Sequence, residues 1–282
     1  MRAAAARWRV VELLHPIPSL LTTLAALAFA WIFGIGPGDR RFWWIATIML
    51  LVQFSISALN EWADADLDRR ARRQRPIPLG LVSRGAALAI AVVAAVGAFL
   101  LCVLADLGPV ALLLVGIGTA CGWAYDLRLK ATPLSVVPFA IAFPLMPFWI
   151  GALAARPLSS LVILFLGGIP LAAAIHLADA IPDRDADRAA GLRTLAVALG
   201  TPRAELAAAG LLLLGSLVAT VLVIRRGQSS TVALSLIAVV ASALVVGLSS
   251  RVPRLSSVFG KWMVIAAAAL AAVPLVAEAS GR

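Results

Sequence analysis

The chain has 282 residues, of which 62% are hydrophobic and only 13% are charged. Charged residues supply about a quarter of a typical soluble domain, so this composition excludes one and indicates an integral membrane protein. The net charge is +10, but the Lys and Arg residues border apolar stretches instead of forming one patch, which argues against nucleic acid as a partner. The two cysteines, Cys102 and Cys121, lie inside apolar stretches and are interpreted as small core residues.

Apolar stretches of helix length follow one another along the whole chain. The fold class that we expect is therefore all-α, a polytopic membrane protein forming a single domain over residues 1–282. A helix needs about 20 apolar residues to cross a bilayer, so the length leaves no room for a separate soluble domain. Nine spans are predicted, at Leu13–Ile35, Phe42–Leu59, Ala86–Leu104, Val110–Trp123, Pro133–Ala154, Leu158–Ala180, Ala204–Ile224, Thr231–Leu248 and Met263–Val276.

Two details of this span pattern have alternatives. Only a few residues, Asp106–Pro109, join the third and fourth spans, so eight spans with one re-entrant segment is the alternative to nine. The first span resembles a signal peptide, because arginines precede its apolar centre. Its long apolar run favours a span that is retained.

The Lys and Arg residues divide unevenly between the two sides of a nine-span chain. Of the 24, 18 fall at the N-terminus and in the second, fourth, sixth and eighth connections. Positive charge accumulates on the cytoplasmic side of membrane proteins. We therefore predict a multi-pass protein of the cell membrane whose N-terminus and even-numbered connections are cytoplasmic.

Eight of the 14 acidic residues form two clusters on that predicted cytoplasmic side. The first cluster follows the second span and the second follows the sixth; their members are Glu61, Asp64, Asp66 and Asp68, and Asp179, Asp183, Asp185 and Asp187. Each cluster comes at the C-terminal end of a span, where the helix dipole disfavours carboxylates unless a cation neutralises them. We therefore expect the two clusters to share a cation.

The spacing within the clusters indicates which cation. Asn60, Asp64 and Asp68 recur every four residues, as do the three aspartates at 179, 183 and 187, so a helix would present one oxygen donor per turn on one face. Mg²⁺ prefers such hard oxygen ligands and fills its other positions with water and substrate phosphate. Pro182 disfavours helix at Ile181, so we expect this geometry to hold only in part in the second cluster.

Cationic side chains flank both clusters. Arg72 and Arg73 follow the first cluster, Arg193 follows the second, and Lys130 lies on the connection between the fourth and fifth spans. Guanidinium groups bind phosphate oxygens in pairs, so these cations together with metal-binding carboxylates are the groups needed to hold a diphosphate. The alternative is that the arginines only set the orientation in the membrane.

Five short stretches of the chain form a recognisable pattern: NEWADADLD at 60–68, RPIPLG at 75–80, YDLRLK at 125–130, DAIPDRDAD at 179–187 and GLRTLAVALG at 191–200. Together they resemble the UbiA superfamily of intramembrane aromatic prenyltransferases. The two acidic motifs, 111 positions apart from Asp68 to Asp179, are the most specific part of this resemblance, which covers nearly the whole chain.

The resemblance implies a fold and a reaction. The fold would be nine helices around a central cavity, with a cytoplasmic cap and an apolar tunnel for the prenyl chain. The reaction would be a Mg²⁺-dependent transfer of a polyprenyl group from its diphosphate, through an allylic cation, to a lipophilic acceptor. An aromatic acceptor, as in the biosynthesis of quinones and related prenyl lipids, is the expected class. The implied partners are the two substrates and membrane lipid, with no obligatory protein partner.

The resemblance also implies roles for individual residues. Asn60, Asp64, Asp68, Asp179, Asp183 and Asp187 would be the metal and diphosphate ligands. Arg72 or Arg73, Lys130 and Arg193 would contact the diphosphate, and Tyr125 would lie near the reacting end of the prenyl group. The catalytic residues among these are Asp64, Asp68, Asp183, Lys130 and Tyr125.

Three further positions concern the acceptor. His176 lies one turn before Asp179 and is a candidate contact for the acceptor or for a motif carboxylate; the alternative is a buried histidine satisfied by the core. The chain departs from the family pattern at Glu61, where Asp is usual, and at His15, where Arg is more common.

Two other functions are alternatives to a prenyltransferase. A CDP-alcohol phosphotransferase also uses aspartates as metal ligands, but its motif opens with Asp-Gly, which this chain lacks. A cation-coupled transporter would place its acids near the membrane midplane, whereas these acids lie at the predicted helix ends.

Overall fold

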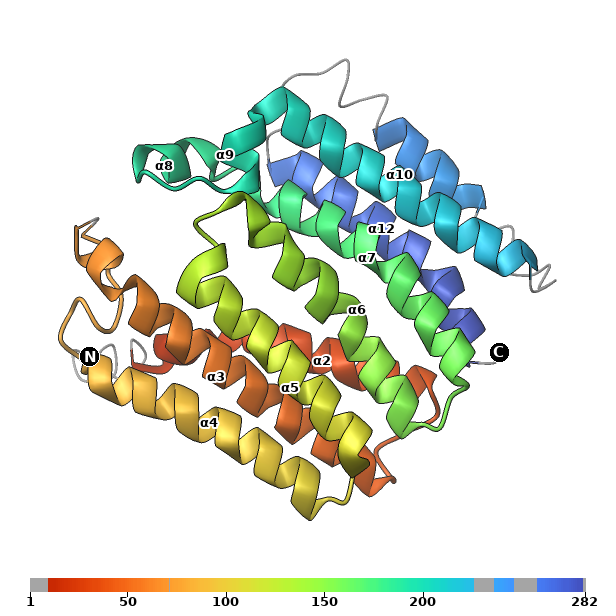
Figure 1. Ribbon diagram of the computed structural model, residues 1–282, viewed down its shortest axis with the longest axis horizontal. Helices are drawn as coiled ribbons and strands as arrows, with labels where there is room; N and C mark the ends of the chain where they lie inside the picture. Colours follow the sequence, from red (N-terminus) through yellow and green to blue (C-terminus); the bar gives the residue numbers. More distant parts are fainter. Residues whose placement is uncertain (1–9, 71, 226–235, 246–257, 281–282) are drawn as a thin grey trace. The chain divides into compact units, whose positions relative to one another are not determined.

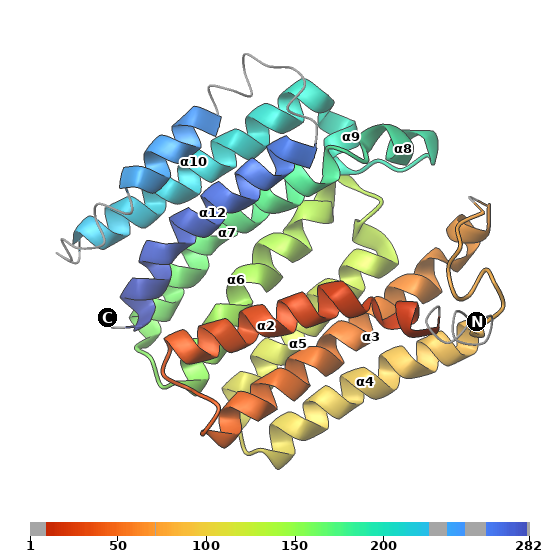
Figure 2. The ribbon, with the colours of Figure 1, turned by 180° about the vertical axis from the view of Figure 1, so that it is seen from behind.

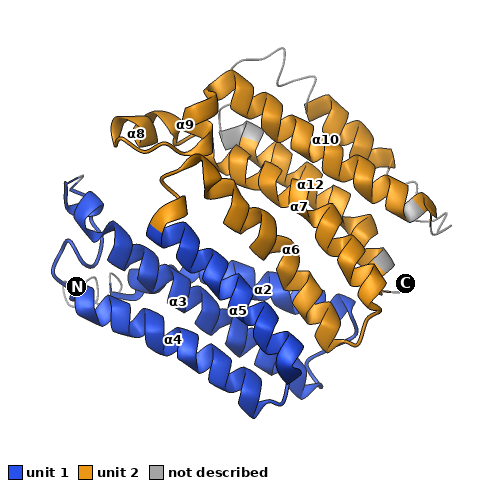
Figure 3. Ribbon diagram, in the orientation of Figure 1, with its two compact units in different colours: residues 1–127 blue, residues 128–282 orange. Residues whose placement is uncertain are grey.

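A computed structural model describes residues 10–70, 72–225, 236–245 and 258–280. Within these ranges the chain contains helices and no β-strand, which confirms the all-α prediction. The chain divides into two compact units, residues 1–127 (unit 1) and residues 128–282 (unit 2), which Figure 3 shows in different colours.

Helix α3 is the centre of unit 1. It packs against η1, α2, α4 and α5, and Figures 1 and 2 show these helices from opposite sides. After α5 the chain enters a π-helical turn, η2. The elements are η1 (Glu12–Leu14), α2 (Pro16–Ile32), α3 (Arg40–Arg70), α4 (Arg84–Leu104), α5 (Gly108–Ala124) and η2 (Tyr125–Leu129), of which unit 1 includes the part up to residue 127.

Side chains cap the two longest helices of unit 1. Asp39 precedes α3 and accepts a hydrogen bond from the backbone N–H of Arg41 at 2.8 Å. The Arg41 side chain also donates to Asp39, which holds the pKa of that carboxyl below its usual value. Ser83 precedes α4, and its Oγ accepts from the N–H of Ala86 at 3.0 Å. Both caps satisfy N–H groups that have no partner inside the helix.

One serine joins three helices of unit 1. The Oγ of Ser55, on α3, donates to the carbonyl of Ala91, on α4, at 2.7 Å. The same oxygen accepts from the indole N–H of Trp123, on α5, at 3.0 Å. Small residues let membrane helices approach closely enough for such bonds, and the fully buried Ala58, Ala87 and Ala91 allow that approach here.

Helix α7 is the centre of unit 2. It packs against α6, α10 and α12, and the short α9 contacts α7, α8, α10 and η3. The buried hydroxyls of Ser216 and Ser242 lie 2.7 Å apart and join α10 to the helix over Leu236–Val245. The other elements are η3 (Pro133–Ser135), α6 (Val136–Leu153), α7 (Leu158–Ala180), α8 (Arg184–Ala189), α9 (Leu195–Leu199), α10 (Thr201–Arg225) and α12 (Val258–Ser280).

The helices confirm an integral membrane protein. Among the described residues, six helices are long and apolar enough to cross a bilayer: Arg40–Arg70, Arg84–Leu104, Gly108–Leu129, Pro133–Leu153, Leu158–Ala180 and Thr201–Leu222. The third and fourth predicted spans are two separate members of this set. Three shorter apolar helices, Pro16–Ile32, Leu236–Val245 and Lys261–Ala277, correspond to the first, eighth and ninth predicted spans. The ends of the eighth predicted span lie outside the described residues, and the count of nine stays a prediction.

Candidate functional site

The first acidic motif lies on the C-terminal part of α3. This helix has 31 residues, so it is about 46 Å long and exceeds the ~30 Å hydrocarbon core of a bilayer. The helix continues without a break through Asn60, Asp64 and Asp68, which confirms the predicted helical spacing. Because these residues are four apart, their side chains leave the same face of α3.

The remaining aspartate of this cluster has different partners. Asp66 is half exposed, and its two oxygens accept from Arg69 at 3.0 Å and from Arg84 at 2.9 Å. Asp66 is two residues away from both Asp64 and Asp68, a spacing that does not bring side chains onto one helix face. It therefore belongs to a surface ion-pair group and not to the motif.

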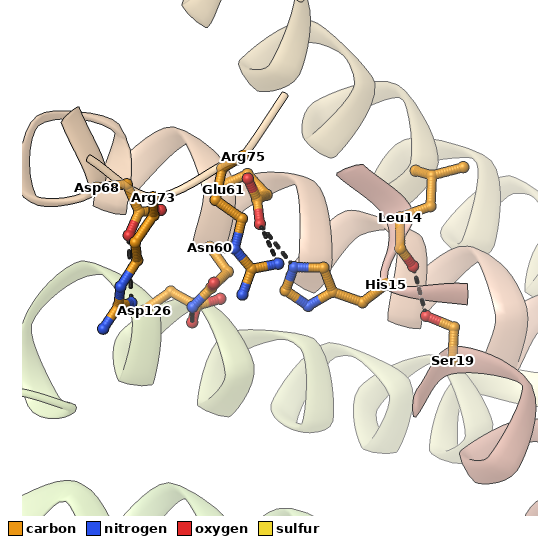
Figure 4. Close-up of polar contacts among 9 residues, drawn as sticks. All are labelled: Leu14, His15, Ser19, Asn60, Glu61, Asp68, Arg73, Arg75 and Asp126. Atoms are coloured by element: carbon orange, nitrogen blue, oxygen red, sulfur yellow. Dashed lines mark hydrogen bonds and ion pairs between the residues drawn. The ribbon is translucent and has the colours of Figure 1, made fainter. Parts of the chain in front are cut away.

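Asn60 is held by a residue that the sequence did not single out. Its amide Nδ2 donates to Oδ1 of Asp126 at 2.8 Å (Figure 4). Asp126 lies on the π-helical turn η2 and is buried, with 3% of its surface exposed. The only signal for it in the sequence is its place inside the YDLRLK stretch, next to Tyr125.

Asp68 is paired with one of the two predicted arginines. It is 3% exposed, and Nη1 of Arg73 lies 3.2 Å from its Oδ1 (Figure 4). The backbone N–H of Arg73 also donates to the Asp68 carbonyl at 2.9 Å, which ends α3. Arg72 is exposed and has a left-handed backbone, with φ of 53°. The structure thus brings Arg73 to the acidic motif, and no such contact of Arg72 is found among the described residues.

The two departures from the family pattern meet in the structure. Oε1 of Glu61 accepts from His15 Nε2 at 2.8 Å and forms an ion pair with Arg75 Nη1 at 3.3 Å (Figure 4). Glu61 is only 2% exposed, and its Oε2 is buried with no hydrogen-bond partner among the described residues. This carboxylate therefore links the start of α2, α3 and the loop after α3. The sequence identified His15 and Glu61 separately, but not their contact.

Tyr125 and Lys130 lie at the two ends of the π-helical turn. Tyr125 begins this turn in unit 1, and Lys130 follows it in unit 2; both side chains are half buried. Within unit 2, the backbone N–H of Arg193 donates to the carbonyl of Ala131 at 3.0 Å. This bond holds the loop of Arg193, whose side chain is exposed, next to the residue that follows Lys130.

The second acidic motif is divided between two helices. Asp179 lies in the last turn of α7, which ends at Ala180, and Asp187 lies in α8. Pro182 falls in the turn between them, and Asp183 immediately precedes α8. The predicted partial loss of helical spacing at this proline is confirmed.

The aspartates of the second motif have different surroundings. Asp183 is exposed, whereas Asp187 is half buried and accepts a weak hydrogen bond from Thr194 Oγ1 at 3.4 Å. Asp179 forms an ion pair with Lys261 of α12. The sequence does not single out Lys261 for this contact, because it lies 82 positions from Asp179 and in no motif.

His176 is buried in the core of unit 2. Its Nε2 lies 3.2 Å from Ser135 Oγ, and its ring centroid lies 4.3 Å from that of Phe139. Only 5% of His176 is exposed. These contacts match the alternative of a satisfied core histidine, and a contact with substrate stays a prediction.

The described residues of unit 1 include an oxygen atom that is a candidate ligand for Mg²⁺. No group of three or more His, Cys, Asp or Glu side chains in the described part of the chain is placed to hold a metal ion. Mg²⁺ does not require such a group, since it binds through one or two carboxylates and completes its shell with water and phosphate oxygens. The buried Oε2 of Glu61, to which no described residue donates a hydrogen bond, is an acceptor atom beside the motif that a cation would satisfy.

Comparison with known proteins identifies one family model and several relatives of this chain. The model of the UbiA prenyltransferase family matches residues 19–254. A digeranylgeranylglyceryl phosphate synthase of Korarchaeum cryptofilum is 32% identical over 197 residues, which is 68% of each chain. A 4-hydroxybenzoate octaprenyltransferase of Polynucleobacter asymbioticus is 31% identical over 195 residues, again 68% of each chain.

Solved structures share the fold at low sequence identity. A solved structure from work on digeranylgeranylglyceryl phosphate synthase in membranes aligns over 100% of both chains, with a TM-score of 0.77 and 14% identity. A UbiA homologue from Archaeoglobus fulgidus, bound to GPP and Mg²⁺, aligns over 96% of this chain and 98% of its own, with a TM-score of 0.74 and 18% identity.

Proposed function

The chain belongs to the UbiA prenyltransferase family, and from that premise we propose that it transfers a prenyl group from a prenyl diphosphate to a lipophilic acceptor. The observation that carries this proposal is the extent of the family match, residues 19–254, which encloses both acidic motifs. Family membership decides against a CDP-alcohol phosphotransferase and against a transporter.

In this proposal the oxygen atoms of both motifs hold Mg²⁺ and the diphosphate. The ligands are Asn60, Asp64, Asp68, Asp179, Asp183 and Asp187. Bound Mg²⁺ supplies a Lewis acid that stabilises the charge developing on the leaving diphosphate. The binding of GPP and Mg²⁺ by the Archaeoglobus fulgidus homologue supports this assignment.

Cationic residues of the chain complete the diphosphate site. Arg73 forms an ion pair with Asp68, and its guanidinium group carries further N–H groups that can donate to phosphate oxygens. We assign the same role to Arg72, Lys130 and Arg193. Fixed positive charge at the leaving group lowers the barrier because it needs no reorganisation during the reaction. Tyr125 is assigned to the reacting end of the prenyl group, where an aromatic face stabilises a cation.

The acceptor proposed is aromatic. The 4-hydroxybenzoate octaprenyltransferase relative supports this class and a role in quinone biosynthesis. The digeranylgeranylglyceryl phosphate synthase relative supports a glyceryl phosphate lipid as the second candidate. The chain departs from the family pattern at His15 and Glu61. For both candidate classes, we expect the residues around these two positions to determine which acceptor binds.

The proposed topology has nine membrane helices around a central cavity, with the N-terminus and the site on the cytoplasmic side under a cap. The distribution of Lys and Arg supports the orientation. A membrane-impermeant maleimide applied outside intact cells tests it with cysteines introduced at two connections. Gly38→Cys is expected to be labelled and Arg188→Cys is not; the reverse pattern would overturn the orientation.

The activity is tested with purified protein, geranyl or farnesyl diphosphate and Mg²⁺. The acceptor panel contains 4-hydroxybenzoate and geranylgeranylglyceryl phosphate, and the products are identified by mass spectrometry. Asp64→Ala and Asp183→Ala are expected to lose at least 100-fold in diphosphate release, as removal of groups that stabilise the transition state does.

Each of these variants has a matched control. Asp66→Ala, on the same helix, removes a carboxylate that pairs with surface arginines, and Asp185→Ala removes one that is 89% exposed and pairs with Arg184. Both controls are expected to keep activity within about threefold of the original protein. Diphosphate release that persists in Asp64→Ala and Asp183→Ala would refute the site assignment, and a protein that prenylates no acceptor would refute the aromatic and glyceryl phosphate classes.

A further inference from the structure

Asp126 is an ionisable residue with no assigned role in the reaction proposed above. It is 3% exposed, whereas the next residue, Leu127, is 48% exposed, so the polar side chain points inward and the apolar one outward. An ionisable residue inside a membrane protein is costly and is retained where it has a function. Asp126 also lies on the π-helical turn at Tyr125–Leu129, a rare geometry that is frequent at functional sites.

The contact between Asp126 and Asn60 fixes how the Asn60 amide is turned. A carboxylate offers only acceptor atoms, so the amide presents its NH₂ group to Asp126, with Nδ2 and Oδ1 at 2.8 Å. The amide oxygen lies on the other branch of the planar amide group and therefore faces away from Asp126. This oxygen is the only atom of the Asn60 side chain with which a hard cation can be coordinated.

We infer that Asp126 is a positioning residue that orients the Asn60 carbonyl oxygen toward Mg²⁺ and the prenyl diphosphate. The inference rests on the proposed function, because it takes Asn60 to be a ligand. Partners that hydrogen-bond to metal ligands fix their orientation, and their loss typically lowers metal affinity by about 10–100-fold. Without Asp126, the Asn60 amide can rotate and present its NH₂ group, which a cation repels.

The test uses the full-length protein in detergent and the unreactive analogue geranyl thiolodiphosphate. Binding of this analogue is measured while Mg²⁺ is titrated, so the readout is the Mg²⁺ midpoint and not turnover. Asp126→Asn keeps an acceptor oxygen for the Asn60 NH₂ and is expected to stay within about threefold of the original midpoint. Asp126→Leu removes the acceptor and is expected to raise the midpoint about 10–100-fold.

A second comparison shows whether the effect passes through Asn60. In an Asn60→Ala background, adding Asp126→Leu is expected to change the midpoint by less than twofold, because residues that act through one another are not additive. The control is Thr119→Val, which removes a buried hydroxyl from α5 whose hydrogen bond, to the Val115 carbonyl at 2.8 Å, lies within that helix. It is expected to leave the midpoint unchanged.

Several results would overturn the inference. These are an Asp126→Leu midpoint within threefold of the original, equal losses in Asp126→Asn and Asp126→Leu, and a further loss on adding Asp126→Leu to Asn60→Ala. If Asp126→Leu does not give folded protein, Asp126→Ser replaces it, because its short hydroxyl does not reach Asn60. Failure of the original protein to bind the analogue in Mg²⁺ would instead count against the proposed function.

Discussion

The buried carboxylate of Glu61 is expected to stabilise unit 1 more than the exposed carboxylate of Asp66 does. The two residues lie on the same helix, and each contacts two basic side chains: His15 and Arg75 for Glu61, Arg69 and Arg84 for Asp66. They differ in burial, since Glu61 is 2% exposed and Asp66 is 50% exposed. Replacing each acid by its amide removes the charge and keeps the shape.

The magnitude follows from the contacts of Glu61. A hydrogen bond to a charged group contributes about 1.5–3 kcal/mol and a neutral one about 1 kcal/mol, so Glu61→Gln weakens the His15 bond by about 1 kcal/mol. The Arg75 contact is longer, at 3.3 Å, and Arg75 is 40% exposed, so its loss adds less than about 1 kcal/mol. The free energy of unfolding is therefore expected to fall by about 1–2 kcal/mol.

The assay is thermal unfolding in detergent, followed by tryptophan fluorescence. For a protein of this size the expected loss corresponds to a decrease in melting temperature of about 2–3 °C. Asp66→Asn is expected to lower it by less than about 2 °C, because exposed ion pairs contribute about 0–1 kcal/mol. Equal shifts in the two variants, or a shift below 1 °C for Glu61→Gln, would refute the reasoning that burial gives the Glu61 contacts their strength.

Three further predictions concern helix packing, helix capping and metal. In α5, a Cβ at Gly122 would lie 2.6 Å from Ile56 Cγ1, so Gly122→Ala is expected to cost about 1–3 kcal/mol. At Gly118, no other side chain or neighbouring helix among the described residues would lie within 4 Å of an added Cβ, so Gly118→Ala is expected to gain up to about 1 kcal/mol from helix propensity. Thermal unfolding of the two variants tests the packing, and equal shifts in melting temperature would contradict it. Ser83→Ala removes the cap of α4 and is expected to cost about 1 kcal/mol in the same assay, whereas Ser83→Asp should restore most of it. Chelation with EDTA is expected to abolish diphosphate release, and Mg²⁺ to restore it; release that continues in EDTA would contradict metal dependence.

The sequence by itself determined the class of the protein, its helices and the shared helix face of the residues in its first motif. These features depend on local properties: apolar runs predict helices that cross a bilayer, and a spacing of four residues places Asn60, Asp64 and Asp68 on one side of α3. The break at Pro182 was equally predictable, because proline disfavours helix at the preceding residue through contacts with its immediate neighbour.

Only the tertiary structure decided which side chain each acid meets. Asn60 and Asp126 are 66 positions apart, and His15 and Glu61 are 46 positions apart. Whether such residues touch depends on how far each helix is rotated about its axis and where it is in register with its neighbours, and side-chain packing over the whole interface sets both. The π-helical turn that directs Asp126 inward adds a residue to one turn without any change in hydropathy pattern, so periodicity in the sequence does not reveal it.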